Sequence, residues 1–188
     1  MRDLLFWPAL TFAALILAAC TVGPLSTRGA VSPAPIFSGI INTSAPPIII
    51  NGRGSDTIQG GRNFVNQTMA RAFDEGRPVR LSGRFVSAGT MLLHASESIP
   101  GSCIEADTQF AFHRVVQGVS LAIGVPVPLQ GARGDLSNAA VAQAYNPALA
   151  QWFLTGIETG RITGWFTTLT GAELAANFGY PLCNSGQT

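Results

Sequence analysis

The chain has 188 residues, of which 47% are hydrophobic and 11% charged, and its formal net charge is +1. This length is typical of one domain plus a short additional segment, and without a basic stripe nucleic acid is not an expected partner. The first element in chain order is an apolar run, LLFWPALTFAALILAAC, from Leu4 to Cys20. It is shorter than the roughly 20 apolar residues of a membrane span, so we interpret it as the hydrophobic region of a signal peptide.

The end of this run, Leu17-Ala18-Ala19-Cys20, resembles a bacterial lipobox. We predict that residues 1–19 are a lipoprotein signal peptide and that Cys20 carries acyl chains such as palmitate, which anchor the chain to a membrane. An ordinary secretory peptide or membrane anchor is the alternative. Val22, instead of the Asp of an inner-membrane retention signal, favours the outer membrane, with the domain facing the periplasm.

Export determines how the other two cysteines are interpreted. Cys103 and Cys183 are 80 residues apart, and in an oxidising compartment such a pair suggests one disulfide. Free buried thiols are the alternative. There is no CxxC or Cys/His cluster, so we expect no metal site, and no motif suggests a cofactor.

The first part of the mature chain is predicted as a tether followed by the start of a domain. Residues 20–45 are rich in Pro, Ser, Thr and Gly, which is typical of a flexible tether, and the domain spans residues 46–188. Ile48 to Ile50 predicts a buried parallel strand. Arg62 to Glu75 has helical spacing and ends at Gly76, and Val79 to Ser82 predicts the next strand.

Strands and helices also alternate in the second part. Ala88 to Ser96 predicts a short helix, Thr108 to His113 a strand, and Asp135 to Gly156 a helical region that restarts at Pro147. Thr170-x-x-Glu173 is a capping-box pattern that opens a last helix. The alternation predicts an α/β fold with a mainly parallel sheet flanked by helices.

Ser87 and His113 are the candidate catalytic pair. Ser87 stands between a strand and a helix, and a serine hydroxyl needs a base within hydrogen-bond reach to act as a nucleophile. His113 ends a separate strand, and parallel strand ends gather at one edge of a sheet. The other histidine, His94, is expected to point into the packing of its own helix and to be structural.

Two backbone N–H groups are candidates for an oxyanion hole. Ala88 N–H follows the serine at a helix start, where backbone donors are unsatisfied, and Gly54 N–H belongs to the glycine-rich loop Asn51-Gly52-Arg53-Gly54-Ser55. The nucleophile-elbow motif G-x-S-x-G is excluded because Phe85 stands where the first glycine is required.

Four segments follow one another along the chain: III-NGRGS, VRLSG, SAGTMLLHAS and FAFH. In these segments and in their order the chain resembles the proteolytic subunit of Clp protease and its periplasmic relatives in the Clp/crotonase superfamily. The tail, TLTGAE to FG, also resembles that family's ending, so the similarity covers about residues 46–182. The resemblance implies a Clp/crotonase-like spiral of β-β-α units, self-assembly into a homo-oligomer, and a peptide or protein substrate.

The chain departs from the family pattern at two places. Arg53 replaces the first glycine of the loop pair, and the position expected for the acid that orients the histidine falls near Ile162 and Thr163, where there is no carboxylate. Glu158 and Asp135 are the nearest candidates, although neither stands at the family position.

The sequence therefore supports two functions. The first is a membrane-anchored periplasmic serine hydrolase, a peptidase that uses Ser87, His113 and the oxyanion donors Gly54 and Ala88. The second is a catalytically inactive Clp-like lipoprotein that acts as a binding or scaffolding module. Crotonase-type chemistry on coenzyme A is disfavoured because exported compartments lack that cofactor.

Overall fold

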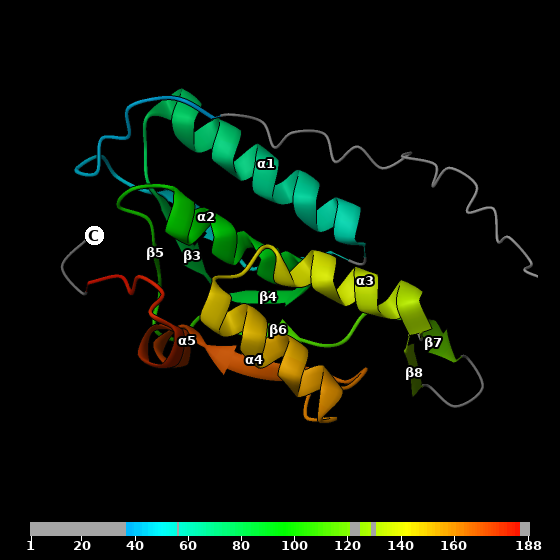
Figure 1. The fold of residues 1–188 in the computed structure, drawn as a ribbon. Helices are drawn as coiled ribbons and strands as arrows, with labels where there is room; N and C mark the ends of the chain where they lie inside the picture. The colour runs from blue at the N-terminus through cyan, green and yellow to red at the C-terminus, as the bar shows by residue number, and fades with distance from the viewer. Residues whose placement is uncertain (1–36, 56, 121–124, 129–130, 185–188) are drawn as a thin grey trace, which may run out of the picture. The chain divides into compact units, whose positions relative to one another are not determined.

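The computed structural model describes residues 37–55, 57–120, 125–128 and 131–184 (Figure 1). The predicted signal peptide, the lipidated Cys20 and the first part of the tether lie outside these residues. Within the described residues, no helix is long and apolar enough to cross a membrane.

The described elements alternate along the chain. The strands are β1 (Ile48–Asn51), β2 (Gly54–Ser55), β3 (Val79–Ser82), β4 (Arg84–Ser87), β5 (Cys103–Ile104), β6 (Gln109–Phe112), β7 (Val116–Ser120), β8 (Val125–Pro128) and β9 (Thr167–Thr170). The helices are α1 (Ile58–Glu75), the 3₁₀ helix η1 (Ala88–Leu92), α2 (Leu93–Ser98), α3 (Gly131–Ala142), α4 (Pro147–Glu158) and α5 (Gly171–Phe178).

The strands form two mainly parallel sheets and one hairpin. The first sheet has the order β1-β3-β5 and the second has the order β2-β4-β6-β9, with β7 and β8 paired to each other. All pairs of the first two sheets are parallel except β6 with β9, which is antiparallel. The predicted α/β fold with mainly parallel strands flanked by helices is therefore confirmed, although these strands form two sheets and not the single sheet that was predicted.

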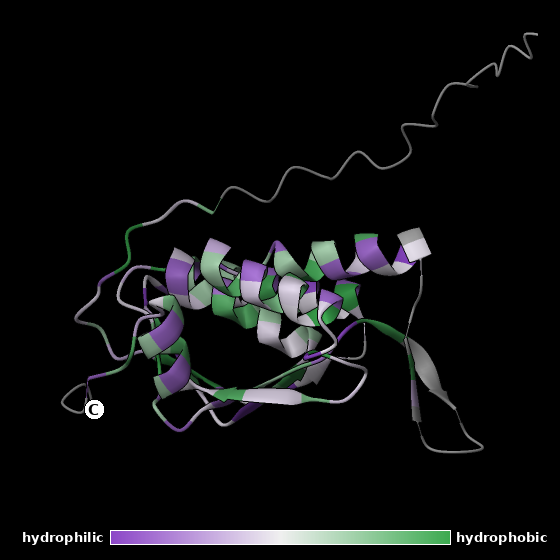
Figure 2. Cartoon of the chain, turned by 60° about the horizontal axis from the view of Figure 1, so that its bottom comes forward, coloured by the Kyte–Doolittle hydropathy of each residue, from purple (hydrophilic) through white to green (hydrophobic). Residues whose placement is uncertain are grey.

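The core lies between the strands and the helices, which Figure 2 shows gathered above the strands. Phe85 of β4 and Phe110 of β6 are fully buried and stack with their ring centroids 5.1 Å apart. Leu92 and Leu93, at the junction of η1 and α2, are also fully buried. This packing fixes β4 and β6 beside each other, and the candidate site stands at the ends of these two strands.

Several helix ends follow from local signals. The Gly76 C-cap of α1 is left-handed, with φ of 63°, a conformation that glycine adopts without steric cost. Asn146 caps α4 by accepting from Leu149 N–H, and Pro147 stands at the first position of the helix. The capping box of Thr170 and Glu173 is present at α5. These three predictions are confirmed.

Other boundaries and burials differ from the prediction. The strand at Ile48 is parallel as predicted, but only one of its faces packs on the core, so Ile48 is buried whereas Ile49, on the other face, is 57% exposed. The helix predicted from Arg62 begins at Ile58 instead, because Thr57 caps it by accepting from Gly60 N–H. The helix predicted after Ser87 consists of a 3₁₀ turn and then α2.

Part of the segment that the sequence assigns to a tether contacts the domain. The ring of Phe37 stacks on that of Phe73 at 6.1 Å, and Asn42 N–H donates to the carbonyl of Gly76 at 2.9 Å. Phe37 and Asn42 of this segment therefore contact the C-terminal end of α1.

The predicted disulfide between Cys103 and Cys183 is present. It joins β5 to the segment after α5, where Ile104 forms an isolated parallel bridge with Leu182 and accepts from Cys183 N–H at 2.9 Å. The C-terminal segment is thus attached to the sheet edge by both covalent and backbone bonds.

Candidate active site

Ser87 occupies a strained turn between β4 and η1. Its φ is 55° and its ψ is −130°, and among the described residues other than glycine it alone has a positive φ. Such a conformation costs on the order of 1–3 kcal/mol and persists only where the surroundings enforce it. The missing glycine motif therefore did not exclude a sharp strand-to-helix turn, which is how a nucleophilic serine is exposed in other α/β folds.

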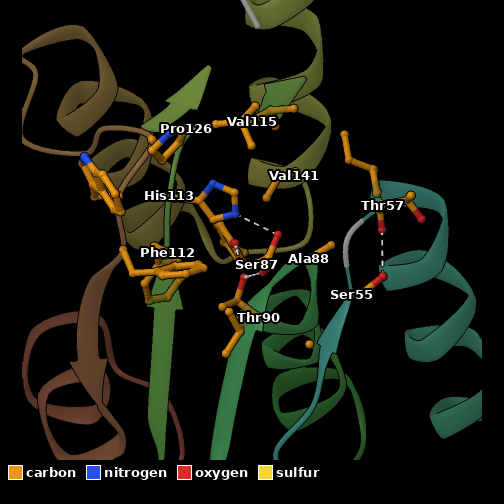
Figure 3. A pocket seen from close by; sticks show the side chains of 18 residues that line it. Ser55, Thr57, Ser87, Ala88, Thr90, Phe112, His113, Val115, Pro126 and Val141 are labelled. Atoms are coloured by element: carbon orange, nitrogen blue, oxygen red, sulfur yellow. Dashed lines mark hydrogen bonds between the residues drawn. The ribbon is translucent and has the colours of Figure 1, made fainter. Parts of the chain in front are cut away.

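The turn brings Ser87 to His113. Ser87 Oγ lies 2.8 Å from His113 Nε2. A dashed line marks this hydrogen bond in Figure 3. The contact follows from the register of the sheet, because Val86 of β4 is paired with Ala111 of β6, so both strands end at the same edge. A proton can pass directly between a hydroxyl and an imidazole at this distance. The structure brings together the two residues that the sequence singled out, and their catalytic roles remain predictions.

His113 is the basic residue available to Ser87. The eleven Lys and Arg residues of the sequence are all arginine, so no lysine can act as the base. The expectation that His94 points into helix packing is wrong, because it is exposed on α2 with its Nε2 3.3 Å from Ser98 Oγ. On α2 the buried positions Leu93, Ala95 and Ser96 flank it, and the histidine falls on the solvent side.

The two predicted oxyanion donors lie beside the serine. Ala88 N–H begins η1 and has no intrahelical acceptor. The backbone carbonyl of Arg53 accepts from Val86 N–H at 2.9 Å, so it points toward β4. Backbone groups alternate in direction along an extended strand, and the Gly54 N–H therefore points away from β4. Among the described strands β2 pairs with β4 alone, and Gly54 and Ala88 both line the same cavity.

The side chain of Arg53, which stands where the Clp-type pattern has a glycine, points out of this loop and does not fill the site. Its guanidinium lies 4.8 Å from the ring centroid of Phe64 on α1. The close approach in the loop depends on other glycines: a Cβ at Gly52 would overlap the backbone of Arg84, and one at Gly89 would overlap the carbonyl oxygen of Arg53. The loop thus packs tightly against the turn that holds Ser87.

A cavity of about 490 Å³ opens at the serine. Its lining includes Phe112, Val115, Val141, Trp165 and Phe166, and none of the described residues that line it is an Asp, Glu, Lys or Arg. The surroundings of Ser87 are therefore apolar, with a few hydroxyl and backbone groups near the reacting atoms.

The environment of His113 favours its neutral form. Burial lowers the pKa of His113 from its ordinary value near 6.5, and a smaller opposing effect of the Arg114 backbone raises it. The ring of Phe166 packs edge-on against the imidazole at 5.0 Å, which excludes water from one side. A neutral imidazole is the form that can accept the serine proton.

No acid orients His113 within the described residues. His113 Nδ1 is buried and has no hydrogen-bond partner there. Ile162 and Thr163, where the family acid is expected, lie close by, since Arg114 N–H donates to the Thr163 carbonyl at 2.8 Å. Asp135 and Glu158 are exposed on α3 and α4 and do not bond to His113.

No protein-family model matches the chain, and no curated protein matches it. Among solved structures, the chain is similar to the 1510-N membrane-bound stomatin-specific protease, solved as a lysine-to-alanine mutant in complex with a substrate peptide. The identity is 14%, the TM-score is 0.45, and the match covers 73% of this chain and 75% of that one. The interpretation of the site accordingly rests on its own geometry.

Two residues beneath the serine were not found from the sequence. Thr90 Oγ1 donates to the carbonyl of Ser87 at 2.7 Å, and Tyr145 OH lies 2.6 Å from the same Oγ1. Thr90 stands three residues after Ser87, which is a local signal for such a bond, whereas Tyr145 is 55 residues further along and carries none. Within the described residues, no group of three or more His, Cys, Asp and Glu is arranged to hold a metal ion.

Proposed function

We propose that this protein is a serine hydrolase of Clp type, a peptidase in which Ser87 is the nucleophile and His113 the general base. The observation that carries the proposal is the 2.8 Å contact between Ser87 Oγ and His113 Nε2 at a strained turn that opens into a cavity. Strain of this kind concentrates where a side chain must be held for chemistry.

The reaction has two steps. Ser87 Oγ attacks the carbonyl carbon of the substrate while its proton passes to His113 Nε2, and the oxyanion that forms accepts hydrogen bonds from Ala88 and Gly54 N–H. His113 then gives the proton to the leaving amine, which departs and leaves an acyl ester on Ser87. Water attacks this ester and gives a proton to His113, which passes it to Ser87 Oγ as the ester bond breaks and the acid product leaves.

A peptide suits the site because β2 is an edge strand. The Gly54 N–H faces the outer edge of this strand, and Ser55 of β2 is in register with Ser87 of β4. An extended peptide that pairs with such an edge brings a backbone carbonyl toward the serine.

A second candidate is the inactive scaffold, and one observation favours it. His113 Nδ1 is buried without a partner among the described residues, so the imidazolium formed in the reaction has no carboxylate to stabilise it there. Loss of the orienting acid costs a serine protease about 10⁴-fold in turnover. Under this alternative the cavity would bind a partner without cleaving it.

Labelling with a fluorophosphonate separates the two candidates. The purified chain is expected to react at Ser87, whereas the Ser87→Ala and His113→Ala variants stay unlabelled. Equal labelling of wild type and Ser87→Ala, or no labelling of wild type beside a reactive control hydrolase, would overturn the hydrolase.

We further propose that the protein is a lipoprotein facing the periplasm, held by acyl chains on Cys20 at the outer membrane. The lipobox-like Leu17-Ala18-Ala19-Cys20 supports the anchor, and a disulfide is typical of an oxidising compartment. Metabolic labelling with palmitate in a Gram-negative host is expected for wild type and not for Cys20→Ser. We also propose that the strands and helices form a Clp/crotonase-like spiral of β-β-α units and that the chain assembles into a homo-oligomer. Analytical ultracentrifugation tests the oligomer by the molecular mass in solution.

A further inference from the structure

Thr90 and Tyr145 form a buried hydrogen-bond chain that ends on the backbone of Ser87. Thr90 is 1% exposed and Tyr145 8% exposed. A threonine hydroxyl has one hydrogen, and here it points to the Ser87 carbonyl at 2.7 Å. The 2.6 Å contact with Tyr145 must therefore be a bond that the phenol donates. Burial raises the pKa of Tyr145, so the phenol keeps the proton that it donates.

The carbonyl that receives this chain shares a peptide plane with the N–H of Ala88. The peptide bond is planar and trans, so its C=O and N–H point in opposite directions. Holding the Ser87 oxygen on Thr90 therefore directs the Ala88 N–H to the opposite side, and Ala88 itself lines the cavity (Figure 3). The position of the Ser87 carbonyl oxygen therefore determines the direction of the Ala88 N–H.

The chain also polarises that peptide. A hydrogen bond to a carbonyl oxygen draws electron density through the amide, and successive bonds strengthen one another in a buried environment. The Ala88 N–H at the other end of the amide then becomes a stronger donor. Neither effect requires Thr90 or Tyr145 to touch a substrate.

Tyr145 contacts the other half of the site as well. Its ring packs edge-on against Phe112 with centroids 5.6 Å apart, and Phe112 directly precedes His113. The ring also packs edge-on against Phe153 of α4. One buried side chain is therefore fixed between the nucleophile turn and the strand that carries the base.

We propose that Thr90 and Tyr145 are positioning residues that orient and polarise the Ser87–Ala88 peptide, and so make the Ala88 N–H an oxyanion donor. The inference rests on the proposed hydrolase for its kinetic consequence. The backbone effect is a property of the free protein and is measurable without any activity.

The kinetic test uses single-group changes in the full chain. Tyr145→Phe removes the phenol hydroxyl, Thr90→Val removes the threonine hydroxyl at constant shape, and Thr90→Ser restores it. We expect the first two to lower kcat on 4-nitrophenyl acetate about tenfold with KM unchanged, less than the 10²–10³-fold of a deleted oxyanion donor. Thr90→Ser is expected to stay within about twofold of wild type, and the double variant to be no slower than either single one.

Tyr180→Phe is the matched control. Tyr180 is also buried, and its hydroxyl accepts from Asn146 N–H at 3.1 Å, so this variant loses a buried phenol bond in the same region. It is expected to lower Tm as Tyr145→Phe does while leaving kcat unchanged. Equal losses of kcat in the two variants would overturn the inference while leaving the hydrolase intact.

The second readout is the Ala88 amide in ¹⁵N-edited NMR spectra of the unliganded chain. Tyr145→Phe is expected to shift the Ala88 N–H resonance upfield by more than Tyr180→Phe does, because the N–H donor weakens. An Ala88 resonance that moves equally little in both variants would overturn the inference. This result stands apart from the fluorophosphonate labelling, whose failure would overturn the hydrolase and not the orientation of the peptide.

Discussion

Arg114 and Thr163 are joined by a backbone hydrogen bond of 2.8 Å, from the Arg114 N–H to the Thr163 carbonyl. The bond sets the loop before β9 next to His113, so the chain position expected for the orienting acid is at the histidine. Thr163 carries a hydroxyl where a carboxylate would be needed. Its side chain is exposed, and its Oγ1 accepts a hydrogen bond from Trp165 N–H.

The neighbourhood of Thr163 predicts that an acid can be restored there. Thr163→Asp puts a negative charge close to His113, and an opposite charge favours the imidazolium. We expect the pKa of His113 to rise, which a pH titration of the ring resonances measures. Gln151→Glu, on an exposed position of α4, adds the same charge without this contact and serves as the control. An unchanged His113 pKa in Thr163→Asp would show that the loop does not face the imidazole.

The buried His113 predicts how activity depends on pH. Burial holds its pKa below the ordinary value near 6.5, with the Arg114 backbone acting in the opposite direction. The base must be neutral, so kcat/KM is expected to rise with pH with a midpoint below 6.5. A midpoint above that value would contradict the assignment of His113 as base, and His94→Gln should leave the profile unchanged.

The same shift has a consequence for stability. Because the folded pKa is lower, the unfolded chain binds a proton at His113 before the folded chain does as pH falls. The contribution of neutral His113 to the free energy of unfolding is therefore fully present above pH 6.5 and is lost as pH falls through the pKa of His113 in the folded chain. Wild type should lose more Tm than His113→Gln between pH 7.5 and 5. Parallel losses in the two proteins would be evidence against the shift.

Phe166 is predicted to maintain the low pKa of His113. Its ring lies edge-on to the imidazole at 5.0 Å and is 49% exposed, so it forms a partial cover. Phe166→Ala admits water, which stabilises the charged imidazole, and the midpoint of the activity profile is expected to move up toward 6.5. Trp165→Ala removes the adjacent exposed ring as a control. The prediction fails if both variants keep the wild-type midpoint.

Local signals predicted much of the fold. Gly76, the Asn146–Pro147 pair and the Thr170–Glu173 box each act within one turn of a helix, and all three helix ends are where the sequence puts them. The meeting of Ser87 and His113, which are 26 residues apart, was predictable for a different reason. It needs only that two neighbouring parallel strands end at one edge.

What the sequence did not predict depends on contacts between distant segments. The bond of Tyr145 to Thr90 spans 55 residues, and no spacing rule connects them. The positive φ of Ser87 occurs where the sequence has no glycine motif to signal it. The exposure of His94 depends on how α2 is rotated, which a helix of six residues does not reveal by its pattern.

Changing Gly52 to alanine is predicted to lower the free energy of unfolding more than changing Gly54 to alanine does. A Cβ at Gly52 would overlap the backbone of Arg84, which cannot move without disturbing β4, so we expect a loss of about 3 kcal/mol in unfolding free energy. A Cβ at Gly54 would meet Val86 Cβ at 3.7 Å, an ordinary contact, and should cost less than about 1 kcal/mol. Urea unfolding of the two variants measures the difference, and equal losses would contradict the packing described for the loop.

The Cys103–Cys183 disulfide is predicted to be a major source of stability. It closes a chain segment of 80 residues, for which loop-closure entropy alone gives about 4.5 kcal/mol. A Cys103→Ser, Cys183→Ser variant is expected to unfold at markedly lower urea concentration, and wild type under reducing conditions should match it. Cys20→Ser leaves the pair intact and should unfold as wild type does under oxidising conditions. Because Leu182 and Cys183 hold the C-terminal segment on β5, the double variant should also be cleaved by carboxypeptidase beyond α5 faster than wild type. An unchanged unfolding midpoint in the double variant would show that the backbone bonds to Ile104 suffice to hold that segment.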